Sequence, residues 1–183
     1  IVFARTKAHR AEHLEQQNSA LVDEKDVPEF TVEKQPFRYD LYRIPFNDGQ
    51  GGKAEPLPGA SQNGMSNYFA RYSPDGKWIV YTTWDNDDAG AIYKVKLDGG
   101  GKKRLTTRPG FYHSPSFSPD GKQLLSGSFD HTAILWDLAT ATPLQTLKGH
   151  SWWVWKARFS PDASRIVTAS QDGKAIVWQK SGS

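Results

Sequence analysis

Two histidines near the start of the chain have the spacing of a metal site. In the stretch His9-Arg10-Ala11-Glu12-His13 they are four residues apart. On a helix they would share one face and could ligate zinc. The H-x-x-E-H pattern also needs a buried helix and a third ligand from elsewhere in the chain. Because this stretch is charged and polar, we interpret it as a solvated loop and predict no metal site.

A second acidic stretch, Asp85-Asn86-Asp87-Asp88, resembles part of a calcium loop. A calcium site needs about 6–8 oxygen ligands at set spacings, and the downstream glutamate of the helical loop type is missing. We therefore interpret the stretch as an acidic turn. The chain also lacks a nucleophile elbow, a phosphate loop and a dinucleotide-binding glycine pattern. We predict no catalytic residues and no cofactor.

Composition limits the class of protein. The chain has 183 residues, no cysteine, a net charge of +3 and a mean hydropathy of −0.65. Without cysteine there is no disulfide and no thiolate metal site. The basic residues are scattered, which argues against a nucleic-acid surface, and no apolar run approaches the ~18–20 residues needed to span a membrane. The compartment stays open between cytoplasm and periplasm.

A repeated turn organises the chain. The stretch S-P-D-G-K begins at Ser73 and at Ser118, and S-P-D-A-S begins at Ser160. In the first two copies proline fixes φ and glycine accepts a positive φ. The copies are 45 and 42 residues apart. A period of about 40–45 residues with several short strands is typical of a propeller blade.

Each repeat unit predicts up to four antiparallel strands around this turn, because short β-rich runs precede and follow it. The expected ranges are Tyr68–Tyr72, Ser114–Phe117 and Val154–Phe159 for the first strand, Trp78–Thr83, Gln123–Ser128 and Arg165–Ser170 for the second, Ala91–Leu97, Ala133–Leu138 and Ala175–Trp178 for the third, and Lys102–Thr106 and Pro143–Leu147 for the fourth.

The two ends of the chain predict incomplete units. Before the first complete unit we expect strands at Ile1–Phe3, Arg38–Phe46 and Lys53–Leu57, with a polar insertion at about 5–36. The last unit stops after its third strand. The fold class is therefore an all-β propeller arc of about four blades with 3, 4, 4 and 3 strands. We expect the blades at 1–66, 67–110, 111–150 and 151–183, within a single domain.

Two different signatures run through these units. Residues 37–121 contain Y-S-P-D-G-K-W-I-V-Y-T, A-I-Y-K-V-K-L-D-G-G and H-S-P-S-F-S-P-D-G-K, and they resemble TolB-type (tricorn-like) repeats. Residues 122–179 contain L-L-S-G-S-F-D-H-T-A-I-L-W-D and I-V-T-A-S-Q-D-G-K-A-I-V-W, and they resemble WD repeats. The resemblance implies a β-propeller. The change of signature follows the shared turn, which fits a natural propeller with mixed blades or an engineered or recombined hybrid.

The WD resemblance implies a structural chain of hydrogen bonds rather than a catalytic triad. It runs from a histidine before the first strand, through a hydroxyl on the second and an aspartate in the next turn, to a tryptophan on the third. The last unit supplies His150, either Ser170 or Thr168, Asp172 and Trp178. The preceding unit supplies Asp130, Trp136 and either Ser126 or Ser128, while Arg108 occupies the histidine position. We expect that second chain to be incomplete.

The stretch Trp152-Trp153-Val154-Trp155 enters a first strand. Alternation sends Trp153 and Trp155 to one face and Trp152 and Val154 to the other. Packing between blades explains such aromatics, but an exposed ring at this entry would be a partner anchor. We therefore name Trp152 and Trp153 as candidate partner-binding residues.

An open arc leaves a sheet face bare at each end. If the two faces expose about 600 Å² of apolar surface, the cost is roughly 15 kcal/mol, comparable to the whole stability of a domain. We expect completion by a second copy or by the remaining blades of a larger protein. A ring closed from this chain alone is less favoured.

From these features the sequence predicts a non-catalytic propeller module for interaction or scaffolding, with protein or peptide ligands and no nucleic acid. One alternative is a hybrid propeller whose only partner is another copy of itself. Further alternatives are an accessory subunit or domain of an envelope enzyme complex and an enzyme with its active site in the channel.

Overall fold

The structure is a computed structural model that describes residues 2–5, 39–84, 90–106 and 110–180. The histidine stretch at 9–13, the acidic stretch at 85–88 and nearly all of the expected insertion lie outside the described residues.

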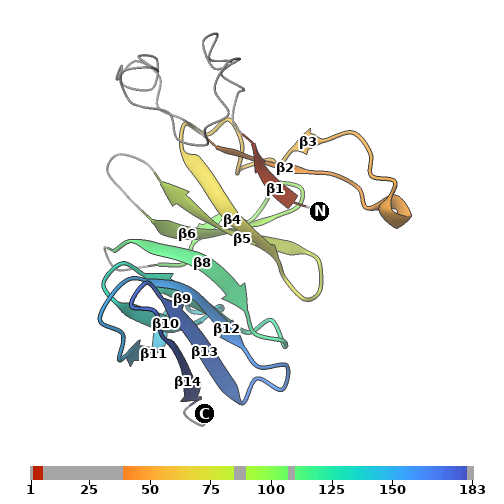
Figure 1. The fold of residues 1–183 in the computed structure, drawn as a ribbon. Coiled ribbons are helices and arrows are strands. Elements are labelled where there is room, and N and C mark those ends of the chain that lie inside the picture. The colour runs from red at the N-terminus through yellow and green to blue at the C-terminus, as the bar shows by residue number, and fades with distance from the viewer. Residues whose placement is uncertain (1, 6–38, 85–89, 107–109, 181–183) are drawn as a thin grey trace, which may run out of the picture.

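Strands form four antiparallel sheets that follow one another in chain order (Figure 1). The first sheet contains β1 (Val2–Arg5), β2 (Asp40–Arg43) and β3 (Glu55–Pro56), with a short 3-10 turn at Asn47–Gly49. The second contains β4 (Ser66–Tyr72), β5 (Trp78–Trp84), β6 (Ala91–Lys96) and β7 (Lys103–Arg104). The third contains β8 (Tyr112–Phe117), β9 (Gln123–Ser128), β10 (Thr132–Asp137) and β11 (Pro143–Lys148). The fourth contains β12 (Val154–Phe159), β13 (Arg165–Ser170) and β14 (Ala175–Gln179).

The described residues confirm the all-β arc with 3, 4, 4 and 3 strands. Most strand limits agree with the sequence to within two residues. The fourth strand of the second sheet is shorter than expected and ends at Arg104. Beyond it, Ile92 accepts a hydrogen bond from the Leu105 amide (2.8 Å) and donates one to the Thr106 hydroxyl (3.2 Å). The hydroxyl replaces the next rung of the ladder.

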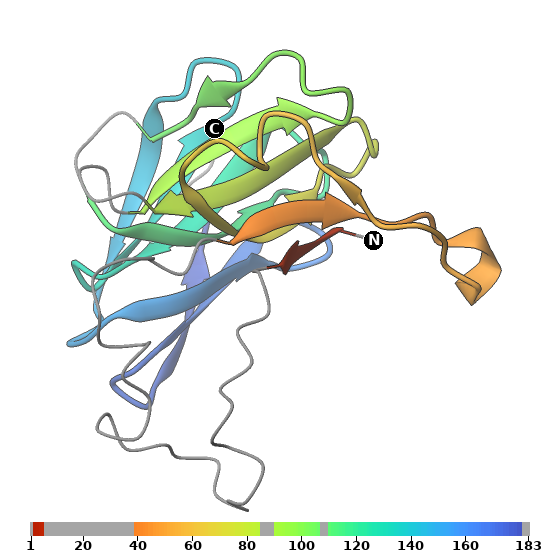
Figure 2. The same cartoon turned by 90° about the horizontal axis from the view of Figure 1, so that it is seen from above.

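The core lies between the sheets, as expected for wedges side by side around an axis. The inner strands β4, β8 and β12 contact one another in turn, and β1 contacts β4. Three apolar clusters occupy the three junctions between neighbouring sheets. Figure 2 shows the sheets turned relative to one another, consistent with strand twist.

Each S-P-D turn is held by the same hydrogen bonds. In the first copy the Ser73 hydroxyl donates to Asp75 (2.5 Å) and accepts from the Trp78 amide (3.0 Å). The pattern repeats from Ser118 and from Ser160. The turn therefore fixes the register of the first two strands in each complete unit.

Every inner strand carries a one-residue bulge near its start. The pairing of β4 with β5 shifts between Tyr68 and Arg71, and Phe69 inside this bulge has φ +56°. Corresponding shifts interrupt β8 and β12. Bulges bend a strand and redirect its side chains. They lie at the end of the sheets opposite the S-P-D turns.

Candidate functional site

A hydrogen-bonded chain connects the segment before β12 with β13, the turn after it and β14. The His150 ring places Nδ1 2.9 Å from Asp172 and Nε2 2.7 Å from the Thr168 hydroxyl. The indole of Trp178 donates to the same hydroxyl at 2.8 Å. The side chains of His150 and Asp172 are 1% and 3% exposed. Buried polar groups without partners are costly, so a chain in which each member has one ties the strands together.

Electrostatics favour the charged form of Asp172. Burial by itself raises its pKa, but hydrogen bonds from His150 and from the backbone amides of Ser151 and Lys174 hold the pKa well below its usual range. The carboxylate is therefore ionised at neutral pH and orients the imidazole.

Of the two hydroxyls that the sequence left open, Thr168 bonds the imidazole and the indole. Ser170 lies two residues further along the same strand and donates to the Trp152 carbonyl at 3.0 Å. Its hydroxyl also accepts a hydrogen bond from the Asp172 amide at 3.1 Å. Ser170 therefore holds the loop before β12 rather than the tryptophan.

In the third sheet the corresponding chain is shorter. The Trp136 indole donates to Ser126 at 2.9 Å. Asp130 accepts from the amide and hydroxyl of Thr132. Among the described residues no histidine bonds Asp130 or Ser126, and Arg108 lies outside them. Trp136 is instead buried edge-on against Tyr112, with ring centroids 5.4 Å apart.

Aromatic side chains gather at the bulged end of the sheets. In an antiparallel pair, the start of one strand lies beside the end of the next. Aromatic residues just before a strand start or just after a strand end therefore lie at the same end of the sheet. We define the aromatic rim as the exposed rings of Phe69, Trp84, Phe111, Trp152 and Trp155. Phe129, which follows β9, connects them by stacking on Phe111 (5.5 Å) and on Trp153 (4.5 Å).

The structure places the two candidate anchors differently. Trp152 is 49% exposed and stacks on His131. Trp153 is half-buried against Phe129 and contacts Trp155 edge-on at 5.8 Å. Val154 is fully buried. Trp152 is therefore the more accessible of the two.

A cavity of about 200 Å³ opens beneath the rim between the second and third sheets. Its walls include Tyr68, Phe69, Phe111, His113 and Phe129, with Thr82 from β5. Burial raises the pKa of Tyr68 to about 12 and lowers that of His113 to about 4, so both stay neutral at pH 7.

The Thr82 hydroxyl and both ring nitrogens of His113 are buried without hydrogen-bond partners among the described residues. The Trp155 backbone lies near the His113 ring and raises the pKa of His113, against the larger lowering by burial. With its polar atoms covered, this cavity suits apolar groups.

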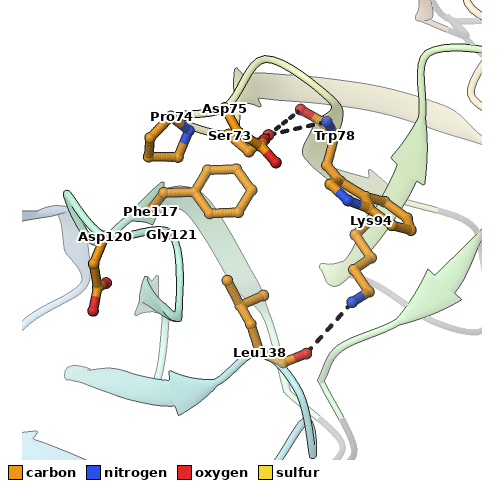
Figure 3. A pocket seen from close by; sticks show the side chains of 9 residues that line it. All are labelled: Ser73, Pro74, Asp75, Trp78, Lys94, Phe117, Asp120, Gly121 and Leu138. Atoms are coloured by element: carbon orange, nitrogen blue, oxygen red, sulfur yellow. Dashed lines mark hydrogen bonds between the residues drawn. The ribbon is translucent and has the colours of Figure 1, made fainter.

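The opposite end of the same two sheets has a different pocket. It measures about 260 Å³ and lies between two S-P-D turns, as Figure 3 shows. Lys94 lies over the Trp78 ring at 4.9 Å and donates to the Leu138 carbonyl at 3.4 Å. Burial, and then the charge of Lys103, lower the pKa of Lys94.

Of the rim residues, sequence reasoning named Trp152 as a candidate and noted Trp155 in the same stretch. It missed Phe69, Trp84 and Phe111, as well as Phe129, although each lies near an end of an expected strand. That repeated position next to strand ends was the available signal. Among the described residues there is no group of three or more potential metal ligands and no helix able to span a membrane.

Comparison with known proteins gives both signatures. Residues 113–137 and 141–179 match the family model "WD domain, G-beta repeat". The Tol-Pal system protein TolB of Francisella tularensis subsp. holarctica (strain OSU18) is 39% identical over 74 residues, covering 38% of this chain and 17% of TolB. The Notchless protein homolog of Arabidopsis thaliana is 73% identical over 33 residues, covering 18% and 7%. WD repeat-containing protein 1 of Gallus gallus is 38% identical over 80 residues, covering 44% and 12%.

The chain therefore spans less than a fifth of the length of these relatives. Two of its segments match the WD repeat model, another part is similar to TolB, and the described residues fold as a partial β-propeller arc.

Proposed function

We propose that the chain is a non-catalytic propeller module that binds protein or peptide segments on its aromatic rim. The observation that carries the proposal is the contiguous set of exposed rings at one end of three neighbouring sheets. Aromatic residues are enriched in the centres of protein interfaces, where they bury large areas at little entropic cost. The WD repeats support the same class of function.

The rim combines an anchor with a recess. Trp152 and Trp155 are exposed on the fourth sheet, and the 200 Å³ cavity lies beside them. None of the described residues that line this cavity is charged at pH 7. An apolar side chain of a bound segment would enter it, while the neighbouring rings cover the segment's backbone.

Binding can be tested by selecting peptides from a random display library on the 183-residue chain. We expect the selected peptides to bind at least tenfold more weakly to the double variant Trp152→Ser, Trp155→Ser. The matched control is Leu144→Ser, which removes an exposed apolar side chain from β11. Failure to enrich any peptide, or equal binding by the double variant, would reject the rim as the binding surface.

We further propose that another blade covers the outer face of the fourth sheet. When no other protein is present, a second copy of this chain supplies that blade. Val167 and Val177 face each other across β13 and β14 on that face, 40% and 63% exposed. Covering such a face recovers about 25 cal/mol per Å² of apolar area. Light scattering should then give twice the chain mass of 20.5 kDa.

The variant Val177→Lys should return the mass to that of one chain, because a buried unpaired ammonium is costly. A wild-type chain that is already monomeric contradicts closure by a second copy. Dimerisation without any peptide binding would instead favour the hybrid whose only partner is itself.

A further inference from the structure

A basic pocket lies among the three S-P-D turns, at the end of the arc opposite the aromatic rim. It measures about 360 Å³ and is bordered by all three turns and by the last residues of β4, β8 and β12. Its lining includes Phe117 and Phe159, and its charged side chains among the described residues are Arg71 and Arg158.

The two arginines occupy equivalent positions in the second and fourth sheets. Arg71 lies two residues before Ser73, and Arg158 lies two residues before Ser160. At the same position the third sheet has Ser116, which leaves room between them. Each guanidinium donates a hydrogen bond to the carbonyl of the preceding residue at 3.1 Å. Both guanidinium groups keep further donors free, because a guanidinium has five N–H groups.

Among the described residues neither arginine lies within ion-pair distance of a carboxylate. The turn aspartates nearby are already engaged, since each accepts a serine hydroxyl and a backbone amide. Burial, and then the charge of Arg71, lower the pKa of Arg158. Among the described residues the pocket therefore holds two positive charges that repel each other and no paired counter-charge.

We propose that this pocket is a second binding site, in which Arg71 and Arg158 together hold a carboxylate from an acidic protein segment. Guanidinium groups form paired hydrogen bonds with planar carboxylates, and a cleft with charge of one sign attracts the opposite charge. The neighbouring Phe117 and Phe159 supply apolar contact for the residues beside the acid.

A protein segment fits this pocket better than a nucleic acid does. The chain has a net charge of only +3, and a nucleic acid would need a longer basic track to contact successive phosphates. Two arginines in one pocket with two phenylalanines match one or two acidic side chains flanked by apolar residues. The site lies away from the aromatic rim, so a partner can occupy either site without the other.

The test titrates the 183-residue chain with the blocked peptide acetyl-Gly-Glu-Glu-Phe-Gly-amide and with its Gln-Gln counterpart, followed by calorimetry or NMR. We expect the glutamate peptide to bind at least tenfold more tightly than the glutamine peptide. Its affinity should fall between about 20 mM and 300 mM salt, because screening weakens exposed charge pairs. Arg71→Gln and Arg158→Gln should each weaken binding about tenfold.

Arg165→Gln is the matched control, because Arg165 lies exposed on β13 of the same sheet and outside the pocket. It should change the affinity less than twofold. Without peptide, Arg158→Gln should leave the melting temperature unchanged or raise it by relieving repulsion, whereas a structural arginine would lower it. Equal binding of the two peptides, an equal loss in Arg165→Gln, or inorganic phosphate binding as tightly as the peptide would overturn the proposal.

Discussion

The third and fourth sheets share one strand pattern but differ in what covers them. Leu125 and Leu135 face each other across β9 and β10 and lie buried in the cluster beneath the fourth sheet. At the equivalent positions of the fourth sheet, Val167 and Val177 form the same cross-strand pair and are exposed. This difference supports the proposal that another blade covers the exposed face of the fourth sheet.

The two sheets also differ inside. The third sheet joins its tryptophan to one hydroxyl and packs it against Tyr112. The fourth joins its tryptophan to Thr168, His150 and Asp172 in one chain. A sheet with neighbours on both faces gains stability from apolar burial. The fourth sheet has one such neighbour among the described residues and depends more on its polar chain.

Truncation of the facing pairs should give the largest difference. Leu135→Ala should lower the free energy of unfolding by about 2–5 kcal/mol, since it leaves a cavity between two sheets. In the chain kept monomeric by dilution, Val177→Ala should cost less than about 1 kcal/mol, as for other exposed positions. Urea unfolding measures both. If Val177→Ala costs as much as Leu135→Ala in the monomer, the face is covered within one chain and the difference between the sheets disappears. In the dimer, where a second copy would cover that face, a larger cost is expected.

The polar chain gives the next largest difference. Thr168→Val keeps the shape but leaves Nε2 of His150 and the Trp178 indole without a partner, while Nδ1 of His150 still bonds Asp172. The expected cost is about 2–4 kcal/mol. Ser126→Ala deprives only Trp136 of a partner and should cost about 1–2 kcal/mol.

Urea unfolding measures the global cost of each variant. Hydrogen exchange of the β12–β14 amides shows whether the fourth sheet also opens locally. Equal costs for Thr168→Val and Ser126→Ala would mean that the chain in the fourth sheet acts only through its tryptophan.

Acid should weaken the fourth sheet through Asp172. Its folded-state pKa is lowered, so its stabilising effect is present above the unfolded value of about 3.9 and is lost as the pH falls below it. Asp172→Asn should therefore be less stable at neutral pH and lose stability less steeply on acidification. Unfolding followed from pH 7 to pH 2 measures the slope of each protein. A slope for Asp172→Asn equal to that of the wild type would contradict this assignment.

The sequence was sufficient for the sheets and turns because their causes are local. Turn chemistry at Ser73, Ser118 and Ser160 fixes strand register, and strand periodicity does the rest. The choice between Thr168 and Ser170 could not be made, since residues two apart on a strand point to the same face. Only their depth beneath the neighbouring sheet distinguishes them.

The binding surfaces could be predicted only in part. Trp152 was recognisable because it precedes a strand, but the rim joins rings from three sheets. The Arg71 and Arg158 pair likewise joins positions 87 residues apart in the chain. Such convergence depends on how the sheets pack, and a strand pattern does not contain that information.

The smallest difference between the two sheets lies in their turns. Gly121 has φ +71° in the third sheet, and Ala163 has φ +57° at the same position in the fourth. A residue with a Cβ costs about 1 kcal/mol at such a positive φ. Glycine avoids this cost but loses more backbone entropy on folding, which offsets part of the difference. Ala163→Gly should therefore stabilise the chain by about 0.5 kcal/mol, and Gly121→Ala should destabilise it by about 1 kcal/mol.

A Cβ at position 121 would lie 3.5 Å from Pro74, an ordinary contact, so Gly121→Ala isolates the backbone effect from any clash. Thermal melting of both variants should show shifts of opposite sign and of about 1–4 °C. Shifts of the same sign would mean that the turn of the fourth sheet relaxes by another route, because the φ angle alone requires the two exchanges to oppose each other.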